Sequence, residues 1–90
     1  MENKKIIKVK AIVIDAKHDI SSNCVIVRLD VNGERRAVEI SPQAIILFDA
    51  DRETSFSIMK SYAEAWKNRK IPLNLELTEA QLRGEEDIAL

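Results

Sequence analysis

The chain has 90 residues, of which 46% are hydrophobic and 32% are charged, and its net charge is −1 at pH 7. This length supports one small domain with one core, and two glycines and two prolines are too few for a disordered or low-complexity chain. The near-neutral charge gives no overall attraction to nucleic acid or to an anionic membrane. No apolar run approaches the ~20 residues of a membrane span, and a single cysteine excludes an intramolecular disulfide, so we expect a cytoplasmic protein.

Residues Ile6 to Ile14 predict the first strand, because they are rich in β-branched side chains and contain neither glycine nor proline. One face carries apolar side chains: Ile7, Val9, Ala11 and Val13. The other face has lysines between apolar ends, so we expect this strand to be central in its sheet or covered by a partner. The segment from Asp19 to Asn23 has the composition of a turn.

Asn32 and Gly33 stand between two alternating segments, which is the strongest short signal for a two-residue hairpin turn of type I′. Such a turn fixes the register, with Val31 opposite Glu34. We expect the core face of this hairpin to carry Val25, Val27, Leu29, Val31, Val38 and Ile40. On the opposite face we expect charged side chains that pair across the strands: Arg28, Asp30, Arg35 and Glu39.

Ser41 followed by Pro42 is typical of a helix start, because serine caps a free backbone N–H and proline fits the first turn. The apolar residues 44–48 would point all around such a helix. We therefore expect a short helix that is either sandwiched or partly a contact surface, with a strand as the alternative.

A second helix is expected from Asp51 or Thr54 to about Lys70, where Pro72 stops it. Its apolar residues recur at helical spacing: Phe56, Met59, Tyr62, Ala63 and Trp66.

Residues 73–77 alternate between leucine and polar side chains and predict a fourth strand. Thr78 and Gln81 form a capping box for a short last helix, which Gly84 ends, and we expect 84–90 to be a frayed tail. The predicted fold is α+β, a single domain over 1–90. It has an antiparallel sheet of about four strands and two to three helices in the order β-β-β-α-α-β-α.

The segment VIVRLDVNGERRAVEISPQAI, the following helix with Phe56 and Ala63, and then LTEAQL resemble a small bacterial domain family without an established activity. The resemblance covers residues 25–82 and rests on length, the glycine hairpin, an Ile-Ser-x-x-Ala helix start and the next helix. The N-terminal strand departs from the family pattern. The resemblance implies the fold and a bacterial or phage origin, and it implies no chemistry.

Few side chains carry reactive chemistry, since His18 and Cys24 are the only soft metal ligands and are too few for a structural zinc site. We interpret His18 as a solvated turn histidine and Cys24 as a small packing residue. Ser21 and Ser22 fit turn polarity, because the sequence contains no nucleophile-elbow motif. Acidic residues within 49–53 lack the glycine of a calcium loop and suit helix capping. We therefore expect neither an enzyme nor a cofactor.

The first strand and the segment after Pro42 leave more apolar surface than one core needs, and such a surplus often marks a protein partner. Coverage by two helices in a compact monomer is the alternative. We expect a non-enzymatic protein-binding module, a homodimer that associates through the edge of the first strand or through the segment 44–48. The residues assigned to this contact are Ile6, Ile12, Ile14, Ile45, Ile46 and Phe48.

Two other functions stay open. A weak nucleic-acid accessory protein would track phosphates with lysines of the first strand and the second helix, namely Lys8, Lys10, Lys60, Lys67 and Lys70. Against it, Glu64 lies at ion-pair spacing among the helix lysines, and no aromatic platform accompanies them. A small chain without motifs also fits a phage-type inhibitor of a host enzyme.

Overall fold

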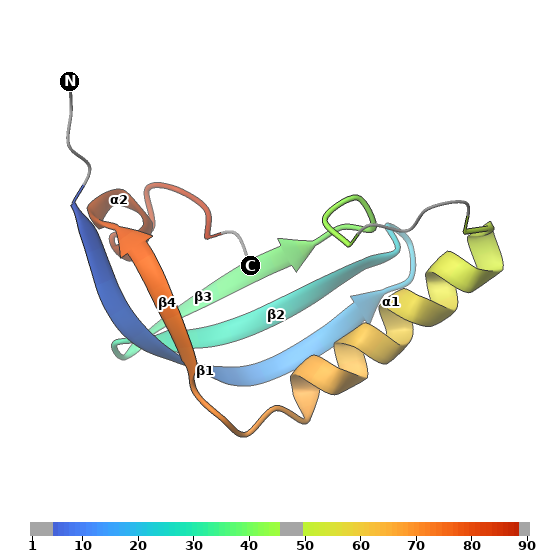
Figure 1. Cartoon of the computed structure of the whole chain (residues 1–90), viewed down its shortest axis with the longest axis horizontal. Helices are drawn as coiled ribbons and strands as arrows, with labels where there is room; N and C mark the ends of the chain where they lie inside the picture. Colours follow the sequence, from blue (N-terminus) through green and yellow to red (C-terminus); the bar gives the residue numbers. More distant parts are fainter. Residues whose placement is uncertain (1–4, 46–49, 89–90) are drawn as a thin grey trace.

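The structure is a computed structural model that describes residues 5–45 and 50–88. Its elements are β1 (Ile6–Asp19), β2 (Cys24–Val31), β3 (Glu34–Ile40), α1 (Arg52–Lys67), β4 (Leu73–Thr78) and α2 (Glu79–Leu82). The strands form one antiparallel sheet in the order β3-β2-β1-β4 (Figure 1). A small α+β domain with a four-stranded antiparallel sheet is thereby confirmed.

The strand β1 is long and bent, and it pairs with strands on both of its sides (Figure 1). It pairs with β4 over Ile6–Ala11 and with β2 over Ala11–Asp19. The register against β2 shifts between Val13 and Asp15, which is a β-bulge. Because the bulge adds one residue, the inward positions change from odd to even numbers, and Ala16 is buried like Ala11. The strand continues beyond the bulge to Asp19, whereas its predicted end was residue 14.

The β2–β3 hairpin has the predicted turn and register. Asn32 and Gly33 have φ angles of 53° and 84°, and these positive values are what a type I′ turn requires. Val31 pairs with Glu34, and the predicted register holds along the whole hairpin. The predicted core face is buried: Val25, Val27, Leu29, Val31, Val38 and Ile40.

The helix α1 covers one face of the sheet along β1 and β2. Its buried side chains are Met59 and Ala63, which join the hydrophobic core. Asp51 is its N-cap, as expected, and accepts a hydrogen bond from the Thr54 backbone N–H at 2.6 Å. The helix ends at Lys67, before the predicted end at residue 70.

The helix predicted from Ser41 is wrong for the described part of that segment. Ser41 to Ala44 form a single turn, in which the Ala44 N–H donates to the Ser41 carbonyl at 3.0 Å. Serine and proline suit the first two positions of a β-turn as well as a helix start. The order is therefore β-β-β-α-β-α instead of the predicted β-β-β-α-α-β-α, and residues 46–48 of the predicted helix lie outside the described residues.

The predicted capping box of Thr78 and Gln81 is confirmed at the start of α2. The frayed tail is wrong up to Ile88, whose side chain is only 7% exposed and belongs to the core cluster. The chain reaches that position through a tight turn, in which the Glu85 N–H donates to the Ala80 carbonyl at 2.9 Å.

This position predicts that Ile88→Ala lowers the free energy of unfolding by about 2 kcal/mol or more, because it leaves a cavity in the core. Ile20→Ala is the matched control, since the Ile20 side chain is 72% exposed in the β1–β2 turn. Urea unfolding measures both variants. Equal and small effects would show that the tail does not pack in solution.

Candidate functional site

The sheet has one covered face and one open face. The inner face carries the core beneath α1, together with Ile88. The outer face is formed by the alternate residues, which point away from that core. Its exposed side chains include Lys8, Lys10, Ile12, Ile14, Lys17, Arg28, Arg35, Ala37 and Glu39, with Asn74 and Glu76 on β4. Within 5–45 and 50–88, no helix packs on this face.

The chain exposes more surface than a compact monomer of its size. Its accessible surface is 6852 Å², whereas about 5,300 Å² is expected for a folded chain of this mass. The radius of gyration is 14.4 Å, against about 12 Å for a compact domain of this length. A bent sheet with helical cover on one side only is consistent with both differences.

Apolar side chains on the outer face lie mainly on β1. Ile12 is 57% exposed and Ile14 is 45% exposed. A hollow of about 420 Å³ opens beside them, and its lining includes Ile14, Arg28, Arg35 and Ala37. Of the contact residues predicted from the sequence, the structure brings Ile12 and Ile14 together.

The other predicted contact residues do not join them. Ile6 is 52% exposed, but Lys8 and Lys10 separate it from Ile12 along the strand. Ile45 is half-buried and packs against the core, while residues 46 and 48 lie outside the described residues.

The predicted association through the edge of the first strand stays a prediction. β1 lies between β4 and β2 in the sheet, and within the described residues it pairs with β4 over Ile6–Ala11 and with β2 over Ala11–Asp19. The strand that ends the sheet beside β2 is β3.

The lysines of the nucleic-acid alternative lie on different sides of the sheet. Lys8 and Lys10 belong to the outer face, whereas Lys60 and Lys67 belong to α1 on the inner side. Lys70 follows the end of α1. In the register, Lys8 also lies opposite Glu76 on β4, and both line an open hollow of about 680 Å³. These lysines therefore do not form one continuous basic surface.

His18 is not the solvated turn histidine that the sequence suggested. Its Nε2 lies 2.8 Å from Asn23 Oδ1, and its ring meets Phe56 edge-on with centroids 4.5 Å apart. The Asn23 amide in turn donates to Ser55 Oγ at 3.2 Å. The histidine thus ties the β1–β2 turn to the start of α1.

The packing role predicted for Cys24 is confirmed. Its side chain is buried, and this burial raises the pKa of the thiol. Ser21 and Ser22 are turn residues, as expected. Both hydroxyls donate to the Asp19 carboxylate, at 2.8 and 3.0 Å, and these bonds lower the pKa of Asp19.

No group of three or more His, Cys, Asp or Glu side chains in the described part of the chain could hold a metal ion. No helix within the described ranges is long and apolar enough to cross a membrane. Comparison with protein-family models, with curated proteins and with solved structures gives no match. The family resemblance inferred from the sequence therefore stays a prediction.

The burial of Cys24 predicts that its thiol reacts with a disulfide reagent at least about tenfold more slowly in the folded protein than in urea. The control is an exposed thiol, made by Ile20→Cys in a Cys24→Ser background. That variant should react equally fast in both states. Fast native modification of Cys24 would contradict the packing role.

Proposed function

We propose that the chain is a non-enzymatic protein-binding module that works as a homodimer and binds a protein partner on the outer face of its sheet. The open outer face is the observation that supports this proposal most directly. The whole chain exposes roughly 1,500 Å² more than a compact monomer of its mass, and a standard interface buries about 800 Å² on each partner. A face that no helix covers within the described residues contributes to this excess and offers room for a partner protein.

The composition of the outer face suits a protein contact. Ile12 and Ile14 supply an apolar centre, and Arg28 and Arg35 stand at the hollow beside them. Arginine is enriched in protein interfaces because its planar group bonds at several points and its stem packs on apolar surface. A face of this kind binds by shape and hydrogen bonding together.

The side chains with reactive chemistry have structural contacts, which supports a role other than catalysis. His18 bonds to Asn23, Cys24 is buried, and Asp19 is bonded by the turn serines. The nucleic-acid alternative finds less support, because its lysines lie on opposite sides of the sheet.

The outer face predicts that Ile12→Asp with Ile14→Asp removes partner binding and leaves the fold intact. The matched control is Ile20→Asp with Ile71→Asp, which makes the same change at two isoleucines that are 72% and 74% exposed outside the sheet. Each immobilised variant is incubated with a native cell extract, with and without nuclease, at low and high salt.

Wild type and the control pair should retain the same protein through nuclease and high salt, and the outer-face variant should not. Equal retention by all three proteins would contradict the proposed face. Material that disappears with nuclease would instead indicate nucleic-acid binding through the lysines. Circular dichroism confirms that each variant is folded.

A further inference from the structure

The strand β3 presents an unpaired edge. It ends the sheet beside β2, and within residues 5–45 and 50–88 the backbone hydrogen bonds of β3 go to β2. The type I′ turn closes on Val31 and Glu34, so this pair exchanges both of its hydrogen bonds. Because antiparallel pairs alternate, Arg35, Ala37 and Glu39 direct their N–H and C=O groups to the free edge.

We propose that a second copy of the chain pairs with this edge, with the two β3 strands antiparallel about a two-fold axis at Ala37. This inference rests on the self-association in the proposed function and names the surface that carries it. Ala37 then lies opposite the partner's Ala37, and Arg35 lies opposite the partner's Glu39. The three outward residues on each strand make about six backbone hydrogen bonds across the axis.

The charges on β3 select this register. Opposed residues in an antiparallel pair point to the same face, so a two-fold register can shift only in steps that keep odd residues opposite odd residues. A register centred on Arg35, Arg36 or Glu39 would oppose two like charges, which is destabilising, and a register centred on Val38 would leave Arg35 and Glu39 without an opposite charge. When the axis lies at Ala37, Arg35 of each copy lies opposite Glu39 of the other copy. The two strands then pair over their full length from Glu34 to Ile40.

Both charges are available for this contact. Arg35 and Glu39 are exposed, and neither forms an ion pair within the described residues, where the ion pairs are Arg36 with Glu34 and Arg83 with Glu79. Asp30 lies opposite Arg35 in the register, as predicted, but the outer charges of the hairpin form no ion pair across the strands within the described residues. In the dimer, opposed Cβ atoms lie about 5 Å apart, within reach of an arginine and a glutamate.

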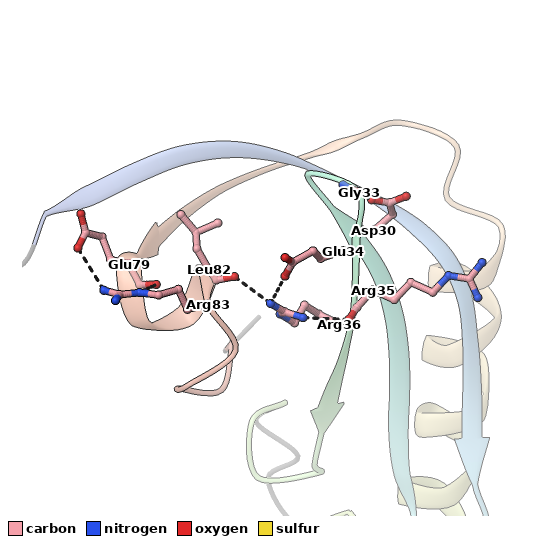
Figure 2. Close-up of polar contacts among 8 residues, drawn as sticks. All are labelled: Asp30, Gly33, Glu34, Arg35, Arg36, Glu79, Leu82 and Arg83. Carbon is pink, nitrogen blue, oxygen red and sulfur yellow. Dashed lines mark hydrogen bonds and ion pairs between the residues drawn. The ribbon is translucent and has the colours of Figure 1, made fainter.

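Arg36 does not block the edge, although a charged side chain within an edge strand commonly prevents pairing. Its guanidinium bonds to Glu34 and donates to the Leu82 carbonyl at 2.8 Å. Figure 2 shows Arg36 directed to α2 and Arg35 projecting from the other side of β3. The arginine on the inner side is thus engaged within its own chain.

The opposite end of the sheet lacks this complementarity. Outward side chains of β4 include Asn74 and Glu76 but no cation, so two copies of β4 would gain no opposed charges. Pairing at β3 also joins the two outer faces into one surface, with the hollows that Arg35 and Ala37 line on either side of the axis.

A charge exchange tests the register directly. Each single variant, Arg35→Glu or Glu39→Arg, should weaken dimerisation about tenfold or more. The reason is that it places like charges opposite each other at two positions across the axis. A mixture of these two variants should form a heterodimer, and the double variant should dimerise like wild type. Sedimentation from about 10 to 500 µM measures each case, since edge pairing buries little surface and is concentration-dependent.

Two further variants separate the edge from general charge effects. Lys17→Glu reverses a charge on β1 and should leave dimerisation unchanged. Ala37→Pro removes an N–H that faces the free edge and spares the bonds to β2, so a folded monomer is expected. Circular dichroism and urea unfolding confirm that each variant keeps the fold.

The outcomes distinguish this inference from the proposed function. A wild type that stays monomeric throughout overturns self-association and the β3 interface together. If the wild type dimerises and the dimer is equally stable in Arg35→Glu, Glu39→Arg and Ala37→Pro, the β3 interface is wrong and self-association stands. Single variants that dissociate but do not recover when mixed overturn the register centred on Ala37.

Discussion

The turn at Asn32 and Gly33 is the constraint on which the rest of the structure depends. Two successive residues with positive φ reverse the chain in a conformation that matches the twist of the flanking strands. A slip of one residue would turn every core side chain of the hairpin to the solvent. The same turn decides which backbone groups of β3 bond to β2 and which face the open edge. The core face of the hairpin, the outer face and the proposed interface therefore all depend on this one turn.

The long strand β1 joins the two halves of the sheet. It pairs with β4 over Ile6–Ala11 and with β2 over Ala11–Asp19, and the strand is bent (Figure 1). α1 packs along the second half, and α2 lies at the end of β4 (Figure 1). A single helix of this length covers only part of one face, so the core is one-sided and the outer face stays open.

Local signals made most of the fold predictable. The hairpin depends on two turn residues, the α2 cap on Thr78 and Gln81, and α1 on the spacing of its apolar side chains. The features that sequence reasoning missed depend on contacts between distant segments. The bulge changes the inward positions of β1 from odd to even numbers, so the alternation in the sequence does not predict that Ala16 is buried. Ile88 follows three acidic residues and belongs to no periodic pattern. The aromatic neighbour of His18, Phe56, comes from α1, and Ser41 and Pro42 suit a turn and a helix start equally.

The sequence indicated surplus apolar surface on the first strand and on residues 44–48, but a strand with two apolar faces does not reveal its neighbours. The structure shows that β3 ends the sheet beside β2, and that Ile12 and Ile14 are exposed on the outer face. The most direct measurement is residue-resolved amide hydrogen exchange along β3 at low and high protein concentration. The account predicts that Arg36 and Val38 are protected at both, while Arg35, Ala37 and Glu39 become protected only at high concentration. Rapid exchange of Arg35, Ala37 and Glu39 at every concentration would contradict it.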